Sequence, residues 1–100
     1  MIVMEDEKEG KPVAFDIASL DTQILLKLFI DILSVKAWQH MGLRVKPGTG
    51  KVEKDLVQAK LAIDCVNFLV DELEPHVKDD EKKSLRSLLA DLQINFARLS

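Results

Sequence analysis

The chain has 100 residues, of which 47% are hydrophobic and 31% charged, and its formal net charge is −3. This length suits one domain with a hydrophobic core, and the composition is not that of a disordered chain. The negative charge disfavours a general nucleic-acid binder, which normally carries a basic face. One cysteine excludes an internal disulfide and gives no sign of an oxidising compartment, so we expect a cytoplasmic protein.

Residues 1–15 are predicted to form a flexible acidic tail, and residues 16–100 a single helical domain. Gly10 and Pro12 are expected to block regular structure in the tail. The most apolar window, residues 24–35, is interrupted by charges and is too short to span a bilayer. No segment alternates apolar and polar residues with the period of a strand.

Three helices are predicted, over residues 21–41, 55–74 and 80–99, and a start of the first helix one turn earlier, at Asp16 or Ser19, is an alternative. Gly42 suits the end of the first helix, because glycine readily adopts the left-handed conformation found there. Asp55 is the predicted N-cap of the second helix, with Gln58 as its capping-box partner. Pro75 is expected to end the second helix, and three acids follow at the positive end of the third.

The first two helices are apolar over most of their circumference. At about 100° per residue, their polar side chains fill narrow strips and leave apolar arcs of roughly 240°. The third helix carries one stripe of about 100°, made by Leu85, Leu88, Leu89, Leu92, Phe96 and Leu99.

Arcs this wide predict that the first two helices pack against further protein, because a helix apolar nearly all round is normally buried all round. The predicted fold class is therefore all-α: a three-helix antiparallel bundle, or a helical hairpin plus a helix, packed into a homodimer. A larger oligomer and a different protein partner remain alternatives. The residues predicted at this oligomer interface are Leu28, Phe29, Ile32, Trp38, Leu61, Phe68 and Leu69. For Trp38 a second interpretation is that it covers the following loop.

The basic segment 44–54 is a candidate anion-binding loop. It differs from a nucleotide-binding P-loop, which requires glycine where Val45 stands and Ser or Thr where Val52 stands. Its glycine amides and bases suit a phosphate or carboxylate; the alternative is a solvated connector. The residues concerned are Arg44, Lys46, Gly48, Gly50, Lys51 and Lys54.

No residue pattern predicts catalysis, a metal or a cofactor. Cys65 is expected to be buried on the apolar arc of the second helix, as a small hydrophobe. Glu72 and His76 have a ligand-pair spacing, but Pro75 lies between them. Asp64 and Asp71 lie on one polar strip of the second helix. A solvent-exposed face is a simpler interpretation of this strip than a pair of carboxylates for acid–base catalysis.

Residues 29–99 resemble a bacterial family known only as domain of unknown function 1844. The resemblance lies in Leu43 and the turn at residues 47–51. It also lies in three pairs of residues on the second helix: Asp55-Leu56, Ala59-Lys60 and Ile63-Asp64. It continues through Leu88-Leu89, Asp91-Leu92 and Phe96. It implies a short helical fold and brings no activity, cofactor or catalytic residue.

Together these features predict a small homo-oligomeric interaction or adaptor module without catalysis. Its expected partner is itself or another protein, and no membrane is involved. The alternative is a weak RNA or anion binder that uses the 44–54 loop.

Overall fold

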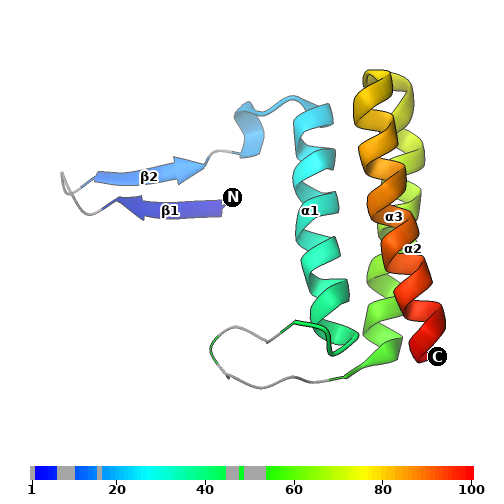
Figure 1. Cartoon of the computed structure of the whole chain (residues 1–100). Helices are drawn as coiled ribbons and strands as arrows, with labels where there is room; N and C mark the ends of the chain where they lie inside the picture. Colours follow the sequence, from blue (N-terminus) through cyan, green and yellow to red (C-terminus); the bar gives the residue numbers. More distant parts are fainter. Residues whose placement is uncertain (1, 7–10, 16, 45–47, 49–53) are drawn as a thin grey trace.

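Three α-helices lie side by side and form the body of the protein (Figure 1). They are α1 (Thr22–His40), α2 (Leu56–Leu73) and α3 (Asp79–Leu99). The computed structural model describes residues 2–6, 11–15, 17–44, 48 and 54–100. Along the bundle α2 runs opposite to α1 and α3, so the prediction of a helical fold with three helices is confirmed.

The end of α1 is a Schellman motif built on Gly42. This glycine has φ of 80°, in the left-handed region that side chains disfavour. Its N–H donates to the carbonyl of Gln39 at 3.0 Å, and the N–H of Leu43 donates to the carbonyl of Trp38 at 3.0 Å. These are the two bonds that define the motif, so the predicted glycine end of the first helix is confirmed.

The start of α2 is capped by Asp55, as predicted. Its carboxylate accepts a hydrogen bond from the N–H of Gln58 at 3.1 Å. The N–H of Asp55 itself donates to the carbonyl of His40 at 2.7 Å. Gln58 therefore takes part through its backbone, and the return bond of a capping box is replaced by one that joins the ends of α1 and α2.

Pro75 separates α2 from α3. It lies in a short 3₁₀ helix, η3 (Glu74–His76), where its missing N–H costs no helical hydrogen bond. Asp79, Asp80 and Glu81 form the first turn of α3, where acids complement the positive end of the helix dipole.

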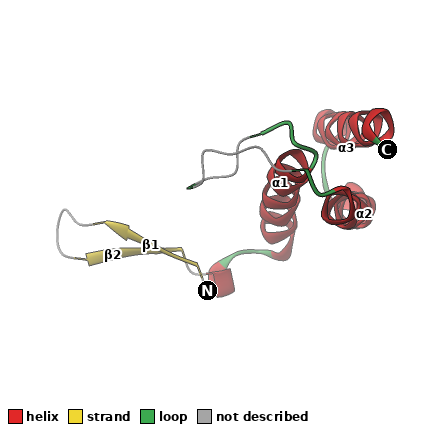
Figure 2. Ribbon diagram, turned by 90° about the horizontal axis from the view of Figure 1, so that it is seen from below, coloured by secondary structure: helices red, strands yellow, loops and turns green. Residues whose placement is uncertain are grey.

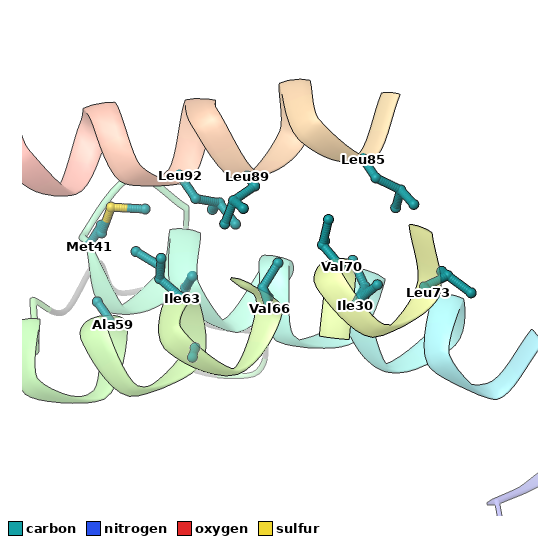
Figure 3. Close-up of a cluster of buried hydrophobic side chains, with 12 residues drawn as sticks. Ile30, Met41, Ala59, Ile63, Val66, Val70, Leu73, Leu85, Leu89 and Leu92 are labelled. Atoms are coloured by element: carbon teal, nitrogen blue, oxygen red, sulfur yellow. The ribbon is translucent and has the colours of Figure 1, made fainter. Parts of the chain in front are cut away.

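The buried core lies between α3 and the pair α1–α2. Figure 3 shows leucines of α3 pointing towards aliphatic side chains of the other two helices. Leu88, Phe96 and Leu99 pack against this cluster, so the predicted apolar stripe of α3 is confirmed. The buried apolar residues are Ile30, Ala37, Met41, Ala59, Ala62, Ile63, Val66, Val70, Leu73, Leu85, Leu89 and Leu92.

Ion pairs join α3 to both other helices. The guanidinium of Arg86 contacts Glu74 (Nε to Oε2, 2.5 Å) and Asp71 (Nη2 to Oδ1, 2.6 Å). The hydrogen bonds from Arg86 are the main reason that the pKa of Glu74 lies below its ordinary value. Lys27 of α1 pairs with Glu81 of α3. These ion pairs hold α3 against one side of the α1–α2 pair, and α3 covers only that side (Figure 2).

A β-hairpin precedes the helices, which the sequence analysis did not predict. Strands β1 (Ile2–Asp6) and β2 (Lys11–Phe15) pair antiparallel, with Ile2 opposite Phe15 and Asp6 opposite Lys11. The expectation that Pro12 blocks regular structure is wrong, because Pro12 lies within β2, whereas Gly10 lies outside the described residues. Proline is tolerated because every strand of a two-stranded sheet has an outer edge that needs no N–H donor. A 3₁₀ turn, η2 (Ile17–Ser19), then leads into α1.

Candidate protein-interaction surface

A groove lined mainly by apolar side chains runs between α1 and α2. It consists of two adjoining hollows. One, of about 390 Å³, is lined by Phe29, Leu33, Asp64, Cys65, Phe68 and Leu69. The other, of about 270 Å³, is lined by Leu33, Lys36, His40, Gln58, Leu61, Ala62 and Cys65. Because Leu33 and Cys65 line both hollows, the two form one surface, which we call the α1–α2 groove.

The groove exists because α2 has more apolar surface than its neighbours cover. Its buried residues recur at helical spacing along one face, from Ala59 to Leu73. Leu61 and Phe68 lie outside that face and remain 59% and 64% exposed. A single exposed leucine is ordinary in a folded protein, whereas contiguous exposed apolar side chains mark interfaces.

α1 has less uncovered apolar surface than α2. Phe29 is 39% exposed and Ile32 is 43% exposed, while Ile30 between them is fully buried. The wide apolar arcs predicted for both helices therefore correspond to one groove in the structure, and α1 and α2 both contribute to its lining.

The predicted interface residues fall into three groups. Phe29, Phe68, Leu69 and Leu61 line the α1–α2 groove. Ile32 is exposed on α1 and Leu28 is half-buried there. Trp38 is half-buried and packs against the core cluster instead.

Several residues that line the groove were not predicted at the interface, and Leu33 and Cys65 are the most central of them. Both line the groove at its middle. Leu33 follows Phe29 by four residues, and Cys65 follows Leu61 by four. Since residues four apart lie on the same face of a helix, this spacing was the available signal.

The prediction that Cys65 is buried is wrong, because its side chain is exposed. The apolar arc of α2 is wide enough to offer two faces, and only the one that carries Val66 packs into the core. Cys65 lies about 100° from Val66 around the helix and falls on the groove side.

The predicted anion loop is described only in part. Arg44, Gly48 and Lys54 are exposed, and Gly48 has φ of 85°. Met41 and Lys54 form an isolated antiparallel bridge, so the two ends of the loop meet beside the end of α1. Lys46, Gly50 and Lys51 lie outside the described residues.

The candidate catalytic and metal-binding side chains are dispersed. Asp64 pairs with Lys60 at 2.8 Å, and Asp71 pairs with Arg86. Within the described segments, no three His, Cys, Asp or Glu residues gather where they would share a metal ion. None of the described helices is both long and apolar enough to cross a bilayer.

A larger hollow, of about 1020 Å³, lies at the other end of the bundle, beside η3 and the first turn of α3. Its lining carries both signs of charge and so favours neither anions nor cations. The lining residues are Gln23, Pro75, His76, Val77, Lys78, Asp80, Glu81 and Ser84.

A family model described as domain of unknown function (DUF1844) matches residues 23–98, which cover all of α2 and all but one terminal residue each of α1 and α3. No curated protein and no solved structure matches the chain.

Proposed function

The chain belongs to the family described as domain of unknown function (DUF1844), and we propose that it is an interaction module without chemistry of its own. In this proposal it forms a homodimer through the α1–α2 groove and acts as an adaptor in the cytoplasm. The observation that carries the proposal is the exposure of Phe68 and Leu61 beside Phe29 in one continuous groove.

Burial of this groove is favourable because it removes apolar side chains from water. Covering a large apolar side chain stabilises by roughly 1.5–3 kcal/mol, and aromatic residues are common anchors of protein interfaces. A second copy supplies a groove of the same composition, so both apolar surfaces are covered in one association.

The cytoplasmic part of the proposal is supported by Cys65. It is a free cysteine with an exposed side chain. Free thiols of this kind are usual in reducing compartments, where disulfides are rare.

The test is to measure the mass of the protein in solution by sedimentation at micromolar concentration. We expect a dimer for the wild type and a monomer for Phe68→Asp, because a charge buried without a partner is costly. Phe68→Asp should keep the helical circular dichroism of the wild type, since its side chain is exposed in the isolated chain.

Ile94→Asp is the matched control. Ile94 is an apolar residue of α3 that is 51% exposed and does not line the groove. This variant should remain a dimer. A folded wild type that sediments as a monomer would contradict the proposal, as would equal dissociation of both variants.

A further inference from the structure

The α1–α2 groove carries opposite charges towards its two ends. Lys36 lines the hollow nearer the end of α1, together with His40. On α2, Leu61, Cys65 and Phe68 line the groove at spacings of four and three, and Glu72 follows four residues after Phe68. This spacing places Glu72 on the same face of α2, beyond the other hollow.

The distance between these charges follows from helix geometry. Leu33 and Cys65 line both hollows and therefore lie at one level of the antiparallel pair. Lys36 is three residues from that level, or about 4.5 Å, towards the end of α1. Glu72 is seven residues from it in the opposite direction, or about 10.5 Å. The two charges are thus about 15 Å apart along the groove.

Neither charge is neutralised by another described residue. The Nζ of Lys36 donates to the neutral side-chain amide of Gln39 at 3.3 Å. Glu72 is exposed and makes no ion pair with any residue that the structure describes. Asp64 and Asp71 on the same helix do have such partners, Lys60 and Arg86.

Building on the proposed self-association, we propose that Lys36 and Glu72 determine how two copies pack: antiparallel, with each Lys36 facing Glu72 of the second copy. A two-fold axis that lies in the interface, perpendicular to the groove, places α1 over α1 and α2 over α2 of the second copy and reverses their direction. Each Lys36 then lies at the level of the second copy's Glu72, across the groove. Both charge pairs then form at once, because an isologous contact occurs twice.

The same two-fold axis also places the apolar residues of the groove favourably. The midpoint between Lys36 and Glu72 lies about 3 Å from the level of Leu33 and Cys65, on the side of Phe68. The most exposed aromatic side chain of the groove therefore lies near the centre of the interface, where anchor residues cluster. A parallel arrangement would instead place Lys36 against Lys36 and Glu72 against Glu72, which is repulsive.

The test uses charge reversal in the full chain, with the dimer dissociation constant measured by sedimentation. Lys36→Glu and Glu72→Lys should each raise this constant about tenfold, because two attractive pairs become repulsive in each dimer. An equimolar mixture of the two variants should form a heterodimer of wild-type strength, since both pairs are then restored. The double variant should also match the wild type.

Matched controls are Lys83→Glu and Asp91→Lys on α3, which make the same charge changes at exposed residues outside the groove. They should leave the dissociation constant unchanged, and circular dichroism should show all variants folded. Single variants as strong as the wild type would overturn the antiparallel arrangement while leaving the dimer intact. A monomeric wild type would overturn the self-association itself.

Discussion

Cys65 shows how much a single side chain's environment depends on assembly. In the isolated chain it is exposed at the middle of the α1–α2 groove, between the hollows that contain Phe29 and Leu61. Its thiol is therefore open to reagents in the monomer. In the proposed dimer the same thiol lies inside the interface, where the second copy blocks access.

We therefore expect the rate at which a maleimide labels Cys65 to depend on protein concentration. Labelling should be fast in dilute solution, where the monomer dominates, and at least several-fold slower well above the dissociation constant. Phe68→Asp should label fast at every concentration and serves as the control. A rate that does not change with concentration, in a protein that sediments as a dimer, would place the interface elsewhere.

At the scale of elements, α3 is held by leucines and by ion pairs, two of which are made by Arg86. Leu85, Leu89 and Leu92 fill the core, while Arg86 spans Asp71 and Glu74 at the surface. The leucine contacts are insensitive to pH, whereas the contact between Arg86 and Glu74 requires an ionised carboxylate. The contact between Arg86 and Glu74 is thus a part of the attachment of α3 that acid removes.

The pKa of Glu74 lies below its ordinary value of 4.5, mainly because Arg86 donates hydrogen bonds to it. Protons therefore bind more tightly to the unfolded chain than to the folded one, and this carboxylate stabilises the fold above pH 4.5. The stabilisation is lost as pH falls below that value through the folded pKa. We expect Arg86→Met to lower the urea midpoint at pH 7, and the difference from the wild type to shrink towards pH 3.

Lys83→Met is the control for this measurement, because Lys83 is exposed on α3 and forms no ion pair with another described residue. Its difference from the wild type should be small at every pH. If the effect of Arg86→Met were the same at pH 3 and pH 7, the contribution of Arg86 would come from packing of its aliphatic stem.

At the scale of the whole molecule, the described core belongs to the helices. Its buried residues extend from Ile30 to Leu92, and the β1–β2 hairpin stands beside α1, away from α2 and α3 (Figure 1). The proposed interface likewise uses only α1 and α2. Both features indicate that the helices fold and associate without the hairpin.

Removal of residues 1–15 should therefore leave the unfolding midpoint and the dimer dissociation constant of the remaining chain unchanged. Thermal denaturation followed by circular dichroism and sedimentation measure the two quantities. Lost helix content would show that the hairpin supports the bundle. A weakened dimer with intact helices would show that the hairpin contributes to the interface.

The helices and their ends were predictable because the signals are local. The turn at Gly42 and the side-chain cap of Asp55 use hydrogen bonds between residues within five positions along the chain. The leucine stripe of α3 leaves this helix only one side to bury. The hairpin was not predictable from local signals, because proline normally indicates a break, whereas the edge strand β2 accommodates Pro12.

Sequence alone therefore determined three helices, their bounds and the excess of apolar surface on two of them. It did not determine which part of that surface is covered. An apolar arc of roughly 240° can pack through either of its flanks with similar burial, so local pattern cannot place Cys65 or Val66 inside or outside. The position of α3, held by its leucines and by Arg86, decided that Val66 is core and that Cys65 and Phe68 line an open groove.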